Sequence, residues 1–152
     1  MTLKKLYKPV VLSLLLAFID NYIKYFVRFN NIQETVVIEN ILTIDLTYNT
    51  GIAFGLLSDK TNITYVLSLI VLIWLLTQFN NVEKDSLEFY SLILILGGAI
   101  GNLGERGYNL FTLNDGKVTD FIELLFIPSF NFADSYITIG ICLLILSELK
   151  NK

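Results

Sequence analysis

Four long apolar stretches constrain what this chain can fold into. They occupy residues 9–27, 63–79, 87–103 and 132–149. Each is about 17 to 19 residues long, the lower end of what crosses a hydrocarbon core of ~30 Å as a helix. Of the 152 residues, 54% are hydrophobic and 16% are charged, a balance more apolar than that of soluble domains. We therefore predict a membrane α-helical protein with four transmembrane helices, forming a single domain over residues 1–152.

The first apolar stretch also has features of a cleaved secretory signal, because Lys4, Lys5 and Lys8 precede it. However, its apolar run is too long for a signal peptide and has no small-x-small cleavage site. Asp20 and Lys24 interrupt its far end, where a disposable signal has no use for them. We therefore expect this segment to remain as the first span.

The basic residues of the short connections predict the orientation. With four spans, one side carries Lys4, Lys5, Lys8, Lys84, Lys150 and Lys152, and the other carries Arg28, Lys60 and Lys117. The side richer in lysine and arginine is expected to be cytoplasmic. Both termini are then cytoplasmic, and the segments around 28–62 and 107–131 lie outside.

The composition excludes several kinds of chemistry. The chain has no histidine and one cysteine, Cys142, which we expect to pack as a small apolar residue in the fourth stretch. Without histidine, no Ser-His, Cys-His or zinc-histidine site can be built. Any hydrolysis must use carboxylates, a lysine or a bound ion. The net charge of −3 and the lack of a basic stripe interleaved with aromatic residues argue against nucleic acid as a partner.

The segment 32–58 is expected to form a small extracytoplasmic β-sheet between the first two spans. Residues 41–48 alternate between apolar and polar side chains, which is typical of a half-buried strand. The short apolar run at 34–39 is a suitable partner strand. Such a sheet has no soluble core of its own, so it either rests on the membrane surface or covers a site.

This segment ends in the sequence Asn49-Thr50-Gly51-Ile52-Ala53-Phe54-Gly55. Its glycines permit positive φ angles and a close approach of the backbone to a ligand. Asn and Gly are also ordinary turn residues. The sequence therefore allows both a tight loop beside a ligand and a plain hairpin turn.

Glycines also mark the end of the third span. Gly97 and Gly101 lie four residues apart and Gly104 follows three beyond, so one helix face is nearly bare and lets another helix approach closely. Glu105 and Arg106 come directly afterwards, at the expected helix end near the outer interface. There they are either solvated or paired with other buried polar groups.

Acidic residues in and beside the apolar stretches are the main functional candidates. Asp20 and Lys24 stand at positions i and i+4 of one helix face, in the order that favours an ion pair. A structural ion pair is the simplest interpretation of these two. Asp120 and Asp134 flank one short connection at the edge of the apolar segments. Two carboxyl groups that converge near hydrocarbon are costly, so a function is the default hypothesis for this pair.

Five motifs occur in a fixed order along the chain. They are Asp20-Asn21-x-x-Lys24, Asn49-x-Gly51-x-Ala53-Phe54, Gly97-Gly98-x-x-Gly101-Asn102-x-x-x-Arg106, Val118-x-Asp120-Phe121 and Phe130-Asn131-x-Ala133-Asp134-Ser135-x-Ile137. As an ordered set with four spans, they resemble signal peptidase II, the bacterial lipoprotein signal peptidase family, over essentially the whole chain. The resemblance implies an inner-membrane aspartic endopeptidase with no cofactor and no metal. Such an enzyme removes the signal peptide of a prolipoprotein on the amino side of the lipobox cysteine, after that cysteine has received a diacylglyceryl group.

The resemblance also implies roles for individual residues. It maps the catalytic dyad onto Asp120 and Asp134. The residues implied to bind substrate or to support the pocket are Asp20, Lys24, Asn49, Gly51, Ala53, Phe54, Asn102, Glu105, Arg106, Asn131 and Ala133. The implied partners are prolipoproteins with a lipobox and a diacylglyceryl-cysteine, and membrane lipid, with the active site near the outer face. Globomycin-type peptide inhibitors would occupy the site, and nothing in the sequence requires more than a monomer.

The chain departs from the family pattern at several positions. Glu105 stands where Asp is usual before Arg106, and its longer side chain is expected to rearrange a hydrogen bond. Ile52 stands where a small residue is usual and is expected to narrow the substrate groove. Thr119 replaces a usual Val. The stretch 107–117 is longer than expected, whereas the connection between the two aspartates is short.

Two carboxyl groups in a site of low dielectric constant are expected to share one proton, because like charge and desolvation both raise one pKa. The ionised acid would then take a proton from the attacking water, and the protonated one would donate to the scissile carbonyl oxygen. The sequence does not assign these two roles.

Two other functions stay open at the level of sequence. One is a proton- or cation-coupled transporter with a relay through Asp20, Glu105, Asp120 and Asp134. The other is a non-catalytic membrane scaffold, which accounts for the glycine face but not for the converging acids. All four acids map to the outer ends of their segments, which favours a site near the surface over a relay across the bilayer.

Overall fold

Four helices and four strands make up the described part of the chain. The computed structural model describes residues 3–51, 57 and 59–150. The helices are α1 (Leu3–Phe29), α2 (Thr61–Gln78), α3 (Leu87–Thr112) and α4 (Phe132–Lys150), and the strands are β1 (Thr35–Ile38), β2 (Leu42–Asn49), β3 (Val118–Leu124) and β4 (Ile127–Phe130). Each of these helices is long and apolar enough to cross a membrane. The predicted membrane helical fold is confirmed.

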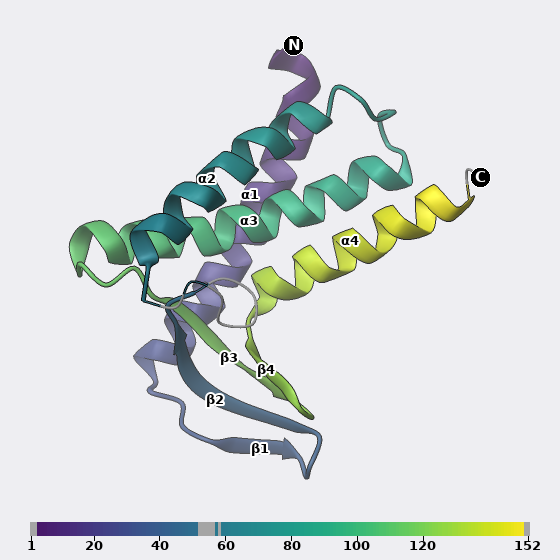
Figure 1. Cartoon of the computed structure of the whole chain (residues 1–152). Coiled ribbons are helices and arrows are strands. Elements are labelled where there is room, and N and C mark those ends of the chain that lie inside the picture. The colour runs from purple at the N-terminus through teal and green to yellow at the C-terminus, as the bar shows by residue number, and fades with distance from the viewer. Residues whose placement is uncertain (1–2, 52–56, 58, 151–152) are drawn as a thin grey trace.

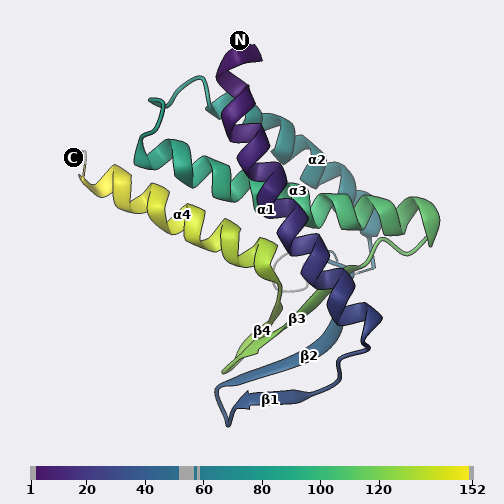
Figure 2. The ribbon, with the colours of Figure 1, turned by 180° about the vertical axis from the view of Figure 1, so that it is seen from behind.

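Helix α3 is the centre of the bundle and packs against α1, α2 and α4. It crosses in front of α1 in Figure 1 and behind it in Figure 2. Both termini and the α2–α3 connection lie at one end of the helices, whereas the sheet lies at the other end (Figures 1 and 2). The two predicted outer segments, which precede α2 and α4, therefore lie at the same end of the molecule.

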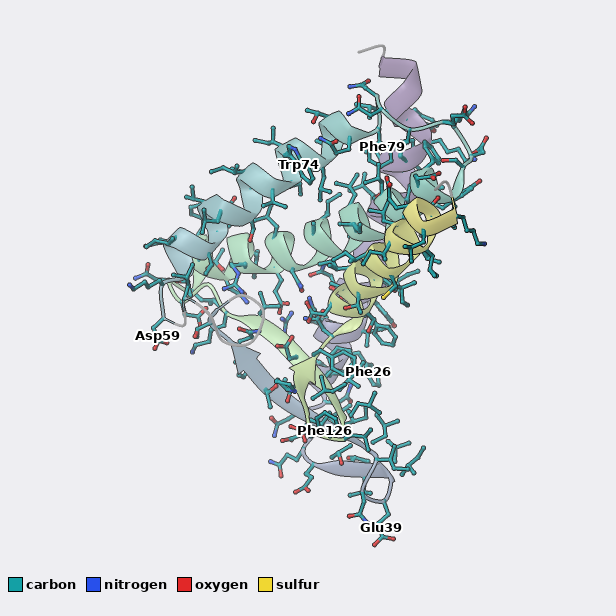
Figure 3. The ribbon with its side chains drawn as sticks, turned by 45° about the vertical axis from the view of Figure 1, so that its right-hand side comes forward. Phe26, Glu39, Asp59, Trp74, Phe79 and Phe126 are labelled. Atoms are coloured by element: carbon teal, nitrogen blue, oxygen red, sulfur yellow. The ribbon has the colours of Figure 1, made fainter. Side chains whose placement is uncertain are left out.

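A buried apolar cluster joins α2 and α3 near their connection. Phe79 and Phe89 meet edge to face with ring centroids 5.7 Å apart, and both belong to a buried cluster with Leu92 and Leu96. On the outward face of α2, Trp74 is 58% exposed and points away from the other helices (Figure 3). An apolar outward face of this kind fits a helix surrounded by hydrocarbon.

The predicted glycine face of α3 is where its neighbours approach most closely. A Cβ atom on Gly97 would lie 2.9 Å from Leu16 of α1, and one on Gly98 would collide with the backbone carbonyl of Ala133 in α4. Gly104 has no such neighbour within 4 Å. A Cβ atom on Gly101 would lie 2.8 Å from Asp20 Oδ2 of α1 and 3.3 Å from Ala133 Cβ of α4. The expectation of close helix approach is therefore confirmed for Gly97 and Gly101 and was wrong for Gly104, whereas the close approach at Gly98 was not predicted.

Helix α3 continues well beyond the predicted span of 87–103 and ends at Thr112. It absorbs much of the stretch 107–117, which the sequence suggested was an unusually long loop. Tyr65 of α2 covers Gly107 and meets Phe111 edge to face at 5.5 Å. Packing against α2 thus sustains the helix past glycines that weaken it locally.

The sheet is antiparallel throughout and has the order β1-β2-β3-β4. The strands predicted at 34–39 and 41–48 are confirmed as β1 and β2. Strands β3 and β4 were not predicted, because adjacent apolar residues such as Phe121 and Ile122 break the alternation that marks a half-buried strand. Glu39, from the turn between β1 and β2, lies at the end of the sheet farthest from the helices, and Phe126, from the turn between β3 and β4, lies nearer to them (Figure 3).

Candidate active site

Asp120 lies in the first part of β3, where the strand is covered on both faces. Residues 118–121 are all buried, and successive side chains of a strand point to opposite faces. Thr119 reaches α1 and α3, through Arg28 and Glu105, whereas Asp120 faces a cavity. The pairing of β3 with β2 sets Thr47 opposite Asp120.

The carboxyl group of Asp120 accepts hydrogen bonds from two amides. Asn49 Nδ2 donates to Oδ2 at 3.1 Å, and Asn131 Nδ2 donates to Oδ1 at 2.6 Å. Burial, together with the negative charge of Asp134, raises the pKa of Asp120 to about 7, although both amides favour the ionised form and lower it. Near neutral pH this carboxyl group therefore exists in both protonation states.

Asp134 belongs to the first turn of α4, where it forms a reciprocal cap with Asn131. Asn131 Oδ1 accepts from the backbone N–H of Asp134 at 3.0 Å, and Asp134 Oδ2 accepts from the backbone N–H of Asn131 at 3.2 Å. This is a capping box in which Asp takes the place of the usual Glu or Gln. Asn102 Nδ2 donates to the other oxygen, Oδ1, at 2.8 Å, so the carboxyl group is fixed from two sides.

Asn131 connects the two acids. Its side chain is fully buried, accepts from the Asp134 backbone and donates to the Asp120 carboxyl group. Its amide nitrogen also lies 3.1 Å from Asn102 Oδ1 and 3.2 Å from the Thr119 carbonyl oxygen. One side chain thus holds the start of α4 and the middle of β3 in a fixed relation.

Both acids line one cavity of about 750 Å³ between the sheet and helices α2, α3 and α4. The predicted site residues that line it are Asn49, Gly51, Asn102, Arg106, Asp120, Asn131 and Asp134. Its other walls are largely apolar and include Leu67 and Val71 of α2 and Ile137 of α4. The arrangement therefore sets two carboxyl groups against a space large enough for part of an apolar ligand.

The remaining predicted residues of the helices lie behind this cavity, in a buried charge cluster. Lys24 Nζ lies 2.7 Å from Asp20 Oδ2 and 3.3 Å from Glu105 Oε2, and it donates to Asn102 Oδ1 at 2.7 Å. The predicted Asp20–Lys24 ion pair is confirmed. Asp20 Oδ1 also accepts from the backbone N–H of Ala133 at 2.9 Å. Ala133 lies in the first turn of α4, and the N-terminus of a helix favours a negative charge beside it.

Arg106 ties the two outer segments together at the rim of the cavity. Its guanidinium group donates to the carbonyl oxygens of Thr50 at 3.2 Å, Gly51 at 2.6 Å and Gly116 at 2.8 Å. Asn49 Oδ1 accepts from the backbone N–H of Gly51 at 2.9 Å, which is a turn closed by a side chain. The predicted residues Ala53 and Phe54, and the departure at Ile52, lie outside the described residues.

Three contributors to this site were missed at the level of sequence: Arg28, Thr47 and Thr119. Thr47 Oγ1 donates to the Asp120 carbonyl oxygen at 3.3 Å. Arg28 had a detectable signal, because it follows Asp20 and Lys24 at the same spacing of four residues and so shares their helix face. Thr119 stood out only as a departure from the family pattern, and its partners could not be predicted because they come from two helices distant in sequence.

Within the described part of the chain, no group of three or more His, Cys, Asp and Glu side chains is placed to hold a metal ion. The polar residues that line the cavity include two carboxyl groups, the amides that donate to them and the Arg106 guanidinium group. Together with the four apolar helices, this describes an integral membrane protein with a pair of carboxyl groups at one cavity.

The chain belongs to the signal peptidase II family. The model of that family, described as Signal peptidase (SPase) II, matches residues 12–150. A lipoprotein signal peptidase of Caldanaerobacter subterraneus subsp. tengcongensis is 36% identical over 138 residues, which cover 89% of this chain and 91% of that protein. One from Pseudomonas fluorescens is 35% identical over 156 residues, covering 93% and 86%.

Solved structures agree with these sequence comparisons. A structure described as a bacterial membrane enzyme superimposes with a TM-score of 0.82 at 28% identity and covers 95% of this chain and 88% of that chain. A second one has a TM-score of 0.77 at 29% identity, with 95% and 94% covered. The chain is thus a multi-pass bacterial membrane protein and an aspartic peptidase, and family membership replaces the transporter and scaffold alternatives.

Proposed function

We propose that this protein removes signal peptides from diacylglyceryl-modified prolipoproteins, cutting on the amino side of the lipidated cysteine, with Asp120 and Asp134 as the catalytic pair. The observation that carries the proposal is the connection of both carboxyl groups through Asn131 at the wall of one cavity. The names of the relatives point to the same substrate class.

The environment of the two acids supports a division of labour between them. The pKa of Asp120 is raised to about 7 by burial and by the negative charge of Asp134, so Asp120 is the group that holds the proton. It donates this proton to the scissile carbonyl oxygen. Asp134, held by N–H donors of Asn102 and Asn131, is the ionised acid that takes a proton from the attacking water.

The remaining residues are proposed to position substrate and acids. Asn49, Gly51 and Arg106 form the rim that contacts the peptide beside the scissile bond, and Asn102 and Asn131 orient the acids. Asp20, Lys24, Glu105 and Ala133 support them from behind. Ala53 and Phe54 are proposed to bind substrate.

The apolar walls of the cavity suit a lipid-modified substrate. Leu67, Val71 and Ile137 line it from α2 and α4, so an apolar signal helix and acyl chains can pack there without exposing apolar surface to water. One chain supplies both acids, and we propose that it works as a monomer. Globomycin-type peptides are proposed to occupy the same cavity.

The site is proposed to face the outer side of the bacterial inner membrane, with both termini in the cytoplasm. Support comes from the position of the sheet, at the end of the helices opposite both termini (Figures 1 and 2). Lys84, Lys150 and the N-terminal lysines belong to the end that carries the termini, where a positive bias is expected inside the cell.

The test replaces each acid by its isosteric amide, Asp120→Asn and Asp134→Asn, and measures processing of a diacylglyceryl-modified prolipoprotein by the purified enzyme. Each change removes a proton donor or acceptor, so kcat is expected to fall by about a hundredfold or more.

Asp45→Asn is the matched control, since Asp45 lies in β2 of the same sheet and does not line the cavity. It should retain activity near that of the original protein. Full processing by either folded cavity variant would disprove the assignment of the pair, and the absence of any processing by the unaltered enzyme would disprove the substrate.

A further inference from the structure

We propose that Arg28, Glu105 and Thr119 form a positioning unit for Asp120 and that Glu105 and Thr119 depend on each other. This inference rests on the proposed function. Its starting point is the buried contact in which Thr119 donates two hydrogen bonds to Glu105.

Glu105 holds Thr119 through both its backbone and its side chain. Glu105 Oε2 accepts from the Thr119 backbone N–H at 3.1 Å, and Oε1 accepts from Thr119 Oγ1 at 2.7 Å. Both residues are buried, with Thr119 fully so. A carboxylate that accepts two such bonds fixes the strand in both position and rotation.

Arg28 completes the unit and defines the direction of the hydroxyl group. Its NH1 donates to Thr119 Oγ1 at 2.9 Å and also to Glu105 Oε1. Because a guanidinium group can only donate, the hydroxyl oxygen accepts from Arg28 and its proton points to Glu105. Loss of the hydroxyl group would therefore remove one partner from each of the two charged groups, in a site that is largely closed to water.

The unit acts on the catalytic acid through the next residue of the strand. The Thr119 carbonyl oxygen lies 3.2 Å from Asn131 Nδ2, which also donates to Asp120 Oδ1 at 2.6 Å. Rotation of β3 at Thr119 would move the Asp120 carboxyl group away from the Asn131 and Asn49 amides. Since these amides favour the ionised form, their loss would raise the pKa of Asp120 further.

The extra methylene of Glu105 explains why the pair should be coupled. A shorter Asp at this position would draw back from the Thr119 hydroxyl group and leave it without an acceptor. Valine at position 119 would instead take one hydrogen-bond partner from Glu105 and one from Arg28, which keep their ion pair with each other. Each single change breaks the same hydrogen bond between Thr119 and Glu105, so the two losses overlap in the double variant and are not independent.

The experiment measures kcat, KM and the pH profile of prolipoprotein processing for Thr119→Val, Glu105→Asp and the double variant. Each single change is expected to lower kcat by about tenfold, the effect of losing a hydrogen bond to a charged group, with KM nearly unchanged. The alkaline limb of the pH profile, along which activity falls as the pH rises, should move to higher pH. The double variant should lose less activity than the product of the two single losses, because both changes break the same hydrogen bond. Thr119→Ser, which retains the hydroxyl group, should behave like the unaltered protein.

Thr43→Val is the matched control, because Thr43 is a half-buried strand threonine whose hydroxyl group has no hydrogen bond within the described residues. If Thr119→Val does not fold, Arg28→Lys replaces it in the test. Lysine keeps the positive charge but lacks the planar guanidinium group that donates to two acceptors at once. This variant should lower kcat and move the alkaline limb of the pH profile in the same way. An unchanged alkaline limb in the folded Thr119→Val or Arg28→Lys protein, or a double variant whose loss equals the product of the single losses, would overturn the proposal. Because the unaltered enzyme must cleave and Asp120→Asn must not, failure here is distinct from failure of the proposed function.

Discussion

Asparagine side chains carry the geometry of the site at the scale of single residues. Asn49, Asn102 and Asn131 each donate to one of the two acids. An amide can donate and accept at once without adding charge, so these residues orient the carboxyl groups while leaving the charge balance to the acids themselves. Asn49 and Asn131 lower the pKa of Asp120, an effect opposite to that of burial.

Asn49→Ala is expected to move the alkaline limb of activity to higher pH. The pKa of Asp120 is raised to about 7, so the proton needed for catalysis is lost as the pH rises through about 7. Removing the Asn49 donor destabilises the ionised form and delays this loss. The pH profile of kcat/KM reports the free enzyme and is the measurement.

Activity of Asn49→Ala at neutral pH should also fall, by about tenfold, because the carboxyl group is less well oriented. Asn30→Ala serves as the control, since Asn30 is exposed and its side chain donates to the Phe26 carbonyl oxygen and, among the described residues, to nothing else. An alkaline limb that stays in place or moves to lower pH would contradict the role given to Asn49.

At the scale of the elements, close packing of α3 against α4 holds the two halves of the site together. Gly98 lies against the backbone of Ala133, one residue before Asp134, so the distance between these helices decides where that acid stands. The same helix carries Asn102, which donates to Asp134. A change of spacing at one glycine therefore acts directly on the acid pair.

Gly98→Ala and Gly104→Ala are expected to have opposite effects. The new methyl group collides with the Ala133 carbonyl at Gly98, which should cost about 1–3 kcal/mol of stability and most of the activity. At Gly104 the space is open, and replacing a helical glycine should stabilise by up to about 1 kcal/mol. Thermal unfolding in detergent, followed by circular dichroism, compares the two, and equal effects would contradict the packing described.

Elements with a local signal were predictable and those held by distant partners were not. Hydropathy gave the four spans, and alternation gave β1 and β2. Strand β3 was not predicted, because Phe121 and Ile122 are both apolar and lie on opposite faces of the strand. The strand there has helices on one side and the cavity on the other, so its residues do not alternate between apolar and polar. The pairing of Asp20 with Lys24 follows from a spacing of four residues, but the contact of Thr119 with Glu105 requires the tertiary fold. The capping box Asn131-x-x-Asp134 had a local pattern and could have been recognised.

At the scale of the whole molecule, the two segments on either side of the α2–α3 hairpin build one structure at the end of the helices opposite both termini (Figures 1 and 2). Strands β2 and β3 pair along their length, from Asn49 opposite Val118 to Leu42 opposite Leu124. Arg106 of α3 then binds carbonyl oxygens from both segments. The active site is thus complete only when all four helices and the sheet have assembled.

Labelling of single cysteines should reveal the orientation of the assembled molecule. In a Cys142→Ser background, Asp115→Cys reports the outer connection and Glu83→Cys reports the α2–α3 connection. We expect a membrane-impermeant maleimide to label intact cells of the first variant about tenfold more than those of the second, with equal labelling after permeabilisation, because lysines mark the side of the second as cytoplasmic. The reverse pattern would contradict the orientation.

The cap at the start of α4 couples the folding of the first helical turn to the arrangement of the two acids. Asn131 both nucleates the helix and bridges the acids, so fraying of the first turn releases Asp134 and Asp120 together. Fraying of a helix end needs far less energy than global unfolding. Warming should therefore inactivate this protein reversibly at temperatures where its membrane helices remain intact. A ligand that binds both acids should stabilise the first turn of α4 against fraying.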